Sequence, residues 1–509
     1  MELPDWFLES ARALIRADSV SAVGNLAALE VLEPLYARAG LPTRRMEWRE
    51  SIDGAPEAVH ANLLAGPGGL DGDCAWSSAE GRAQLDRGEV PESARGGVLF
   101  VTHTDTVPPG PPARWTETGG DPRALTLKDG VLFGLGVADV KLDALCKIAA
   151  AEKLRGRKLA RPFWLSATGA EEVGLRGARR FAESALFKSM QVREVLCGEP
   201  CELALIRAHK GYAVVVCTIT DSATQAIGSA PHTGERARFA EIDFIGKAAH
   251  SSTPMLGDNA ILRALAWAKA SGAKVIGASG GASANTVPAL CTLTVEMDAA
   301  HARPLPEPSR AIATTRVQPD LSRALLATKA LEERWLELVN SLAPTSDPRF
   351  DPAGAVGGLN VLKSASADDR AIVQATLDAR LLPEHDPETL LSLFAAEASR
   401  CVQQIDRALG VEVRVVRNAG GMSLADDAPL VSKVSRTLSR LGLDGTPRAK
   451  PTSTEAGVFA RVGCEAIVIG PGRSTGNAHC ANERIEVAQL EQAIDLYVAL
   501  LEDLCGVRS

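Results

Sequence analysis

The sequence predicts an α/β protein with a central mixed sheet flanked by helices and a smaller α+β domain inserted into it. Between residues 98 and 200, apolar strand-like runs alternate with helix-like segments, a pattern typical of a sheet covered by helices. From about residue 208 the pattern changes to long strands around fewer helices. The length of 509 residues favours at least two domains, at roughly 100 to 200 residues each. We therefore predict one discontinuous domain of residues 1–207 and 416–509, and an inserted domain of residues 208–415.

The first domain begins with two helices, because residues 4–17 and 25–39 carry apolar side chains at helical spacing. The polar, Gly-rich stretch 66–96 predicts a surface insertion. The apolar runs beyond it predict strands at 98–101, 130–136, 162–168 and 193–200, separated by helices at 142–155 and 174–184. Strand and helix patterns return from residue 426 to the end.

The inserted domain is predicted to contain more strand than helix. Apolar and β-branched runs predict strands at 210–220, 237–246, 285–298, 371–380 and 411–418. Helical spacing predicts helices at 258–270, 321–341 and 387–408.

Composition excludes several classes of protein. Hydrophobic residues are 46% and charged residues 23% of the chain, as in globular proteins. The net charge of -8 has the wrong sign for nucleic-acid binding. We expect no membrane partner, because no apolar run reaches the ~20 residues of a bilayer span and the N-terminus does not read as a signal peptide. Ten scattered cysteines without a CxxC pair favour a reducing, cytoplasmic location.

Histidines and acids follow several of the predicted strands. In open α/β sheets the carboxyl ends of the strands form the ligand crevice, so these side chains should gather in one cluster. Crowded carboxylates repel one another unless a cation neutralises them. A set of histidines and carboxylates suits zinc and also accepts cobalt or manganese. The residues are His103, Asp139, Glu171, Glu172, Glu199 and His479.

The number of ligands supports two divalent metal ions, a known arrangement for hydrolysis. One ion would take His103, Asp139 and Glu199. The other would share Asp139 as a bridge and take Glu172 and His479. Two further acids have separate roles: Asp105 lies two residues after His103, where it can hold the imidazole, and Glu171 stays free as a general base.

Each motif taken alone has an ordinary structural explanation. A single H-x-D sequence is usually a polar turn, and adjacent glutamates usually begin a solvated helix. The metal interpretation depends on all of them following apolar strands together. The other histidines in polar surroundings are expected at the surface: His60, His232, His301 and His385.

The motifs VTHTDTVP, GLGVADVK, ATGAEEVG, CGEPCE and GPGRSTGNAHCANE resemble those of the dinuclear zinc hydrolases that include acetylornithine deacetylase, succinyl-diaminopimelate desuccinylase, aminoacylase, glutamate carboxypeptidase and carnosinase-type dipeptidases. The resemblance covers nearly the whole chain. It implies a zinc-peptidase-like catalytic domain, the two-metal assignment above, Glu171 as general base and Asp139 as the bridge. It also implies that the inserted domain is a lid and dimerisation domain, and hence a homodimer.

The resemblance extends to three residues of the inserted domain. His250 in GKAAHSSTP resembles the lid histidine that donates to the oxyanion, and Asn285 in ANTVP resembles a second polar contributor. Arg380 in LDARLLP resembles the arginine that pairs with a substrate carboxylate. The planar guanidinium of arginine suits this role because it can donate two parallel hydrogen bonds to a carboxylate. The structural alternatives are a local cap for His250 and a surface ion pair for Arg380.

The chain also departs from the family pattern. Leu142 and Asp143 replace the usual Gly-Gly, and the stretches 66–96, 221–240 and 302–357 exceed the short family versions. In this family, Glu rather than Asp at the position of Glu199 is typical of deacylases and carboxypeptidases. We therefore predict a hydrolase that cleaves the amide bond of small N-acyl amino acids, with a dipeptidase or carboxypeptidase of the same family as the alternative.

Two further hypotheses belong to other classes. The GASGG sequence fits the nucleophile pattern of serine hydrolases, with Ser279 as the nucleophile. A binding protein that keeps the fold without activity is the other. Sensitivity to a chelator but not to a fluorophosphonate separates the metal hydrolase from the serine hydrolase.

Overall fold

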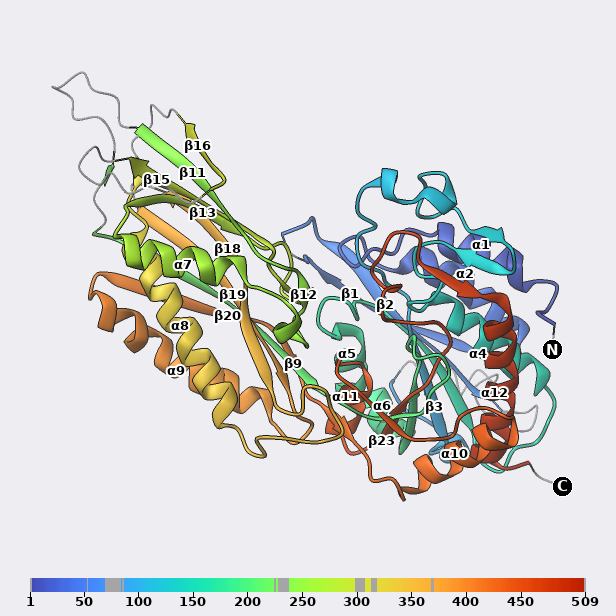
Figure 1. Ribbon diagram of the computed structural model, residues 1–509. Helices are drawn as coiled ribbons and strands as arrows, with labels where there is room; N and C mark the ends of the chain where they lie inside the picture. The colour runs from blue at the N-terminus through green and yellow to red at the C-terminus, as the bar shows by residue number, and fades with distance from the viewer. Residues whose placement is uncertain are drawn as a thin grey trace. The chain divides into compact units, whose positions relative to one another are not determined.

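A computed structural model of the chain describes residues 2–52, 54–68, 84, 87–223, 226–227, 238–297, 307–312, 318–367 and 370–507. The chain forms two compact units, coloured by residue number in Figure 1. The first unit comprises Met1–His209, Met422–Lys450 and Thr454–Ser509. The second unit comprises Lys210–Gly421 and Pro451–Ser453.

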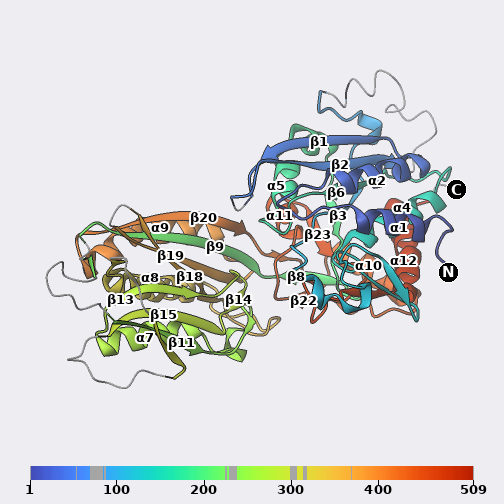
Figure 2. The same cartoon turned by 90° about the horizontal axis from the view of Figure 1, so that it is seen from above.

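The first unit is built on a nine-stranded mixed sheet. Its central strands β6, β3, β7 and β23 run parallel to one another, and β1, β2 and β6 pair antiparallel. Figure 2 shows β1, β2, β6, β3 and β23 side by side. The strands in spatial order are β1 (Thr43–Glu50), β2 (Ala58–Gly68), β6 (Phe163–Thr168), β3 (Val98–His103), β7 (Glu194–Cys197), β23 (Glu465–Val468), β8 (Ile206–His209) and β21 (Met422–Ser423), with β22 (Arg448–Lys450) paired to β8.

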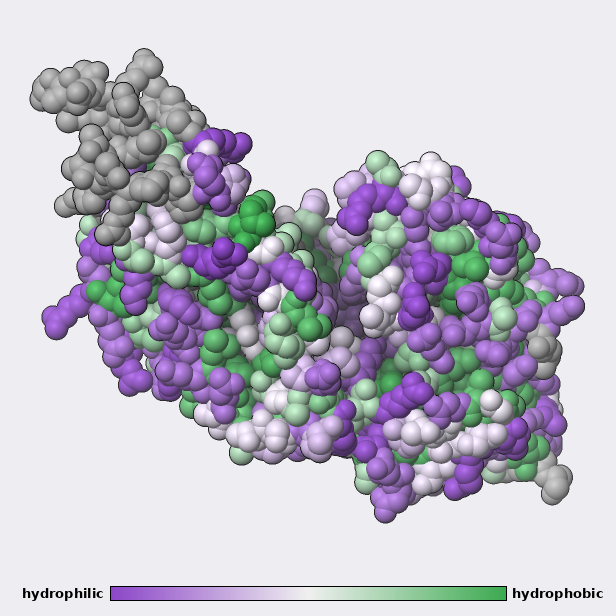
Figure 3. Space-filling view, viewed as in Figure 1, coloured by the Kyte–Doolittle hydropathy of each residue, from purple (hydrophilic) through white to green (hydrophobic). Residues whose placement is uncertain are grey.

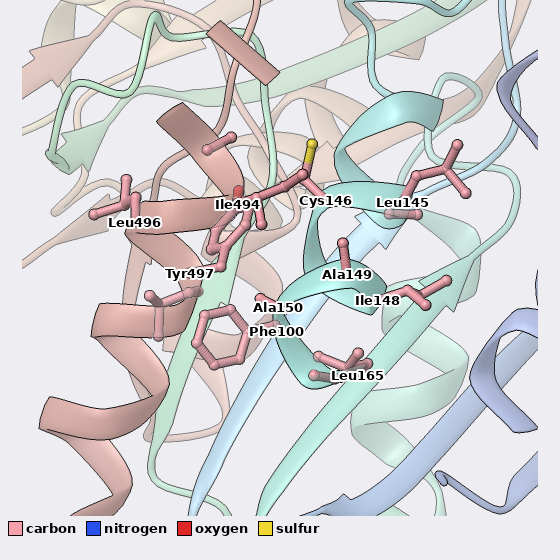
Figure 4. Close-up of a cluster of buried hydrophobic side chains, with 14 of the residues drawn as sticks. Phe100, Leu145, Cys146, Ile148, Ala149, Ala150, Leu165, Ile494, Leu496 and Tyr497 are labelled. Atoms are coloured by element: carbon pink, nitrogen blue, oxygen red, sulfur yellow. The ribbon is translucent and has the colours of Figure 1, made fainter. Parts of the chain in front are cut away.

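Helices pack on this sheet and bury its apolar strands. The helices are α1 (Phe7–Arg16), α2 (Leu26–Arg38), α4 (Lys141–Lys153), α5 (Arg176–Glu183), α6 (Ala185–Met190), α10 (Pro429–Arg440), α11 (Ala456–Arg461) and α12 (Val487–Cys505). Helix α4 is buried on nearly all sides, from Lys141 to Ala151. Figure 4 shows its residues Cys146 and Ala150 close to Tyr497 of α12 and Phe100 of β3. The Phe100 and Tyr497 rings meet edge to face, with centroids 6.0 Å apart.

A small three-stranded sheet completes the first unit. It consists of β24 (Arg484–Glu486), β5 (Val131–Phe133) and β4 (Thr126–Lys128). The strand predicted at 130–136 is therefore β5, outside the main sheet.

The second unit is an antiparallel sheet with helices α7 (Ala260–Ser271), α8 (Ser322–Ser341) and α9 (Pro387–Ile405) against one face (Figure 1). Residues of β9 alternate between buried and partly exposed along its second half, as expected for a sheet covered on one side. Strands in spatial order are β16 (Ser309–Ile312), β11 (Arg238–Ile245), β15 (Leu290–Met297), β13 (Val275–Gly280), β18 (Val356–Ala367), β19 (Arg370–Leu381), β9 (Gly211–Asp221) and β20 (Leu409–Ala419). Two short pairs join β10 (Ala226–Ile227) to β17 (Gln318–Pro319) and β12 (Ala249–His250) to β14 (Thr286–Val287).

The surface prediction for two histidines is wrong. His60 is fully buried on β2, where its ring stacks on Trp48 with centroids 5.6 Å apart, and burial lowers its pKa. His385 is 5% exposed, and its Nε2 lies 2.7 Å from the Pro344 carbonyl oxygen. Polar neighbours in the sequence do not show whether the fold covers a side chain. His232 and His301 lie outside the described residues, as does most of the predicted insertion at 66–96.

The part of the chain that the structure describes contains no helix long and apolar enough to cross a membrane. Hydrophilic and hydrophobic residues are interspersed on the face drawn in Figure 3.

Candidate active site

Four strands of the first unit's sheet end at the predicted ligands. Strand β3 ends on His103 itself, and β6 is followed by Glu171 and Glu172. Strand β7 is followed by Glu199, and β23 leads into the loop that carries His479. These four strands are parallel, so their carboxyl ends lie at one edge of the sheet, where α/β proteins bind ligands.

Asp139 lies between the two predicted metal-binding histidines. Its Oδ1 is 3.2 Å from Nε2 of His103, and its Oδ2 is 3.2 Å from Nε2 of His479. The same Nε2 of His479 is 3.0 Å from Oε1 of Glu172. Ligand atoms of Asp139, Glu172 and His479 lie within 4.8 Å of one another, as do those of His103, Glu171 and Glu172. A carboxylate with one oxygen toward each histidine has the geometry of a bridging ligand.

Glu199 has a partner that the sequence did not suggest. Its Oε2 lies 3.2 Å from the ammonium of Lys450, whose side chain is 11% exposed. Glu199 belongs to neither of the two groups described above. Lys450 comes from β22, far along the chain, so no local motif connects it to Glu199.

Asp105 holds the two adjacent glutamates. Its Oδ1 accepts a hydrogen bond from the backbone N–H of Glu171 at 3.0 Å, and its Oδ2 accepts one from Glu172 at 3.2 Å. The hydroxyl of Ser21 donates to Oδ2 at 2.6 Å. Nδ1 of His103 is 3.1 Å from the backbone carbonyl oxygen of Asp105 but 3.8 Å from its carboxylate. The imidazole thus donates its orienting hydrogen bond from Nδ1 to the Asp105 main-chain carbonyl oxygen, which leaves Nε2 available to a metal.

Glu171 lies in a buried environment that favours its protonated form. Burial raises the pKa of its carboxyl well above the usual 4.5, although the neighbouring His103 opposes the shift.

Another buried acid, which the sequence motifs did not reveal, is Glu455. It is 3% exposed and accepts a hydrogen bond from Thr168 at 3.0 Å. Burial raises the pKa of Glu455 to about 7. A carboxyl whose pKa is raised toward neutrality suits proton transfer at physiological pH.

Both histidines hold their protons tightly when no metal is bound. The charge of Glu172, with Asp139, raises the pKa of His479 to about 12, against the effect of burial. Burial lowers the pKa of His103, but its hydrogen bond to Asp139 and the nearby acids outweigh this and raise it well above 6.5. Imidazole nitrogens and carboxylate oxygens are both common zinc ligands. These residues therefore fit a pair of divalent metal ions.

Metal binding is therefore expected to release protons, because only neutral imidazole is a ligand. The stability that these two protonated histidines give the metal-free protein is present below their unfolded pKa near 6.5 and is lost as the pH rises through their folded pKa values. We expect affinity for zinc to rise between pH 6 and pH 8. Calorimetry of zinc binding in buffers of different ionisation enthalpy should detect at least one released proton per chain; binding with no proton release would contradict these protonation states.

Glu483 holds the loop that carries Asp139. Its carboxylate accepts hydrogen bonds from the backbone N–H groups of Gly136 at 2.8 Å, Ala138 at 2.7 Å and Asp139 at 2.8 Å. Its backbone carbonyl accepts another from Gly134 at 3.0 Å. The side chain is 2% exposed, so the three N–H groups have no access to bulk water as a replacement.

Replacing Glu483 by glutamine puts an amide N–H₂ against backbone donors. We expect Glu483→Gln to lower the free energy of unfolding of the metal-free protein by about 1–3 kcal/mol, measured by urea denaturation. Glu486→Gln, three residues further on and exposed, is the control. Equal stability of the two variants would show that the loop does not depend on this carboxylate.

The three predicted residues of the second unit lie close to one another around Ser251. The backbone N–H of Ser251 donates to the Asn285 carbonyl oxygen at 2.9 Å, and its hydroxyl accepts from Nη2 of Arg380 at 3.2 Å. Arg380 is 4% exposed and its guanidinium lies 3.5 Å from the centroid of the Tyr212 ring, so it is not a surface ion-pair residue. His250 is exposed, and its Nδ1 accepts a hydrogen bond from the backbone N–H of Ser252 at 3.1 Å.

Ser279 is placed differently from a hydrolase nucleophile. It lies within β13, paired with Thr292 on one side and Lys363 on the other. The nucleophile pattern requires a sharp turn between a strand and a helix. The structure therefore gives no support to the serine hydrolase hypothesis.

Comparison with known proteins assigns the sequence to one family. The model for Peptidase family M20/M25/M40 matches residues 99–503. Acetylornithine deacetylase of Myxococcus xanthus is 24% identical over 502 residues, which cover 97% of this chain and 96% of that protein. Acetylornithine deacetylase of Yersinia pseudotuberculosis is 32% identical over 268 residues, which cover 51% of this chain and 54% of that protein. The chain thus spans about half the length of this second relative.

Solved structures share the fold at low sequence identity. Aminoacylhistidine dipeptidase of Vibrio alginolyticus has a TM-score of 0.60 at 15% identity, over 100% of this chain and 98% of that one. An M20 family metallo-carboxypeptidase of Sulfolobus solfataricus has a TM-score of 0.59 at 15% identity, over 98% and 99% of the two chains. A Bacillus subtilis protein described as a dinuclear metal binding peptidase has a TM-score of 0.51 at 9% identity, over 99% and 98%. Since the family model covers most of the sequence, the chain belongs to Peptidase family M20/M25/M40.

Proposed function

We propose that the protein is an N-acyl amino acid deacylase that uses two divalent metal ions, with zinc as the first candidate. The observation that carries the proposal is the position of Asp139, with one carboxylate oxygen facing His103 and the other facing His479. Glu172 and Glu199 complete the proposed ligand set. The deacetylases similar to this chain, one of them over nearly its full length, support an acyl group as the part removed.

When bound, the metal pair would polarise the substrate carbonyl and lower the pKa of water. Glu171 takes the proton from water at its carboxylate and later delivers it to the nitrogen of the leaving amine. Asp105 orients Glu171 through the backbone hydrogen bond of 3.0 Å. The raised pKa of Glu171 makes its carboxylate a stronger base for the first of these proton transfers.

The residues of the second unit are proposed to act on the rest of the substrate. His250 donates a hydrogen bond to the carbonyl oxygen as its negative charge develops, with Asn285 as a further polar contributor. Arg380 pairs with the free carboxylate of the amino acid, in two parallel hydrogen bonds. We also propose that this unit forms a homodimer, which light scattering of the purified protein tests.

The oxyanion role of His250 predicts an effect on turnover and not on metal binding. We expect His250→Ala to fold, to keep both metal ions and to lower kcat by about 10²-fold or more. Metal analysis and steady-state kinetics on the same preparation check this. A kcat equal to that of the wild type would contradict the role.

A substrate screen tests the proposed function. The metal-loaded protein is assayed with N-acetyl and N-succinyl amino acids and with dipeptides, and release of the amino group is measured. Preference for N-acyl amino acids supports the deacylase. Preference for dipeptides would instead support the dipeptidase hypothesis. A metal-loaded protein that turns over none of these substrates would support the hypothesis of a binding protein.

A further inference from the structure

Helix α4 carries charged side chains where the fold offers almost no water. Asp143 is 1% and Lys147 is 3% exposed, and Lys147 Nζ lies 2.6 Å from Asp143 Oδ2. Two charges removed from water need good geometry and further hydrogen bonds.

Asp143 contacts two segments that carry proposed metal ligands, and it lies on the helix that begins just after a third ligand. The hydroxyl of Thr102, the residue before His103, donates to Asp143 Oδ2 at 2.7 Å. Gly198, the residue before Glu199, packs so closely that a Cβ added to it would lie 1.9 Å from the same oxygen. The α4 helix itself begins two residues after Asp139.

The fourth segment is reached through Tyr497 of α12. Its hydroxyl donates to Asp143 Oδ1 and lies 3.3 Å from the carbonyl oxygen of Ile469. Ile469 directly follows β23, at the start of the loop that leads to His479. Tyr497 is fully buried, so this contact is not shared with bulk water.

Lys147 connects the same elements from the other side. Its ammonium donates to the Val101 carbonyl oxygen at 2.8 Å and to the Thr102 hydroxyl at 2.6 Å. It also lies 5.3 Å from the centroid of the Tyr497 ring, a cation–π contact. Its donors are therefore engaged by the end of β3, by Asp143 and by α12.

We propose that Asp143 is a positioning residue for metal binding, which acts together with Lys147 and Tyr497. It fixes the relative positions of four backbone segments: those before His103 and Glu199, the start of α4 after Asp139, and the beginning of the loop that carries His479. The inference rests on the metal ligands of the proposed function. Asp143 touches no proposed ligand side chain; it acts through Thr102, Gly198 and Tyr497. Partners outside the ligands themselves typically change metal affinity by about 10- to 100-fold.

The test measures metal affinity on folded protein by titration of the metal-free chain with Co²⁺, followed by its visible absorption bands. We expect Asp143→Asn to weaken Co²⁺ binding by about 10- to 100-fold and to alter the bands. Tyr497→Phe, which removes one hydroxyl, is expected to weaken binding in the same direction by a smaller factor. Leu504→Ala, also on α12 and 2% exposed, is the matched control that removes buried apolar contact and should keep wild-type affinity.

A double variant separates positioning from simple stability. Asp143→Asn leaves Lys147 as an unpaired buried cation, whereas Asp143→Asn with Lys147→Met removes both charges and should regain stability. If the network positions the ligands, the double variant stays weak in Co²⁺ binding although it is stable. Wild-type affinity and absorption bands in the stable double variant would overturn the inference. A wild-type protein that binds no metal would instead reject the proposed function.

Discussion

Glu171→Gln is expected to keep its bound metal ions and to lose turnover by about 10²- to 10⁴-fold, the contribution usual for a general base. Glutamine has nearly the same shape, and the hydrogen bond from the residue's backbone N–H to Asp105 does not depend on the side chain. The loss should therefore appear in kcat with metal content unchanged. Metal analysis and steady-state kinetics on one preparation provide both numbers.

The exposed residue Glu183, on α5 of the same unit, offers a matched control. Glu183→Gln makes the same chemical change away from the proposed site and should retain wild-type kcat. Turnover of Glu171→Gln within about twofold of that control would remove Glu171 from the mechanism.

Asp139→Asn is expected to have the second largest effect, and it acts on metal binding. The carboxylate faces both histidines at 3.2 Å, whereas an asparagine side chain offers only one oxygen. Because both sites share this ligand, we expect total metal affinity to fall by at least about 10²-fold, more than is typical for an outer-shell partner. Hydrolysis should fall with it and recover only partly at high metal concentration.

Asp129→Asn controls for the loss of one carboxylate nearby in the sequence. Asp129 is exposed, and asparagine tolerates its positive φ of 51°. Calorimetric titration with zinc compares the two variants. Two tightly bound ions in Asp139→Asn would mean that Asp139 does not bridge them.

The sequence could predict that these residues lie together, because the strands are short apolar runs with polar residues directly after them. The apolar runs of β3, β6 and β7 can be recognised from the local sequence alone. Parallel strands then bring the residues after them to one edge of the sheet. His103, Glu172 and His479 lie close together because their strands end at that edge, whereas Asp139 comes from the loop between β5 and α4, outside the main sheet.

The supporting residues were not predictable in this way. Lys450 contacts Glu199 across 251 residues of sequence, and Tyr497 contacts Asp143 across 354. No spacing rule connects such pairs, because they depend on which helices and strands pack together. Glu483 had a weaker signal, since it follows His479 within one motif, but its three backbone donors come from the Asp139 loop.

The central claim is that this chain binds two divalent ions that its hydrolytic activity requires. The most direct measurement is the metal content of the folded protein, purified without chelator, together with activity after chelation and after addition of zinc, cobalt or manganese. We predict two ions per chain, loss of activity on chelation and recovery on metal addition. A folded protein that hydrolyses its substrate with no bound metal, before and after chelation, would contradict the account.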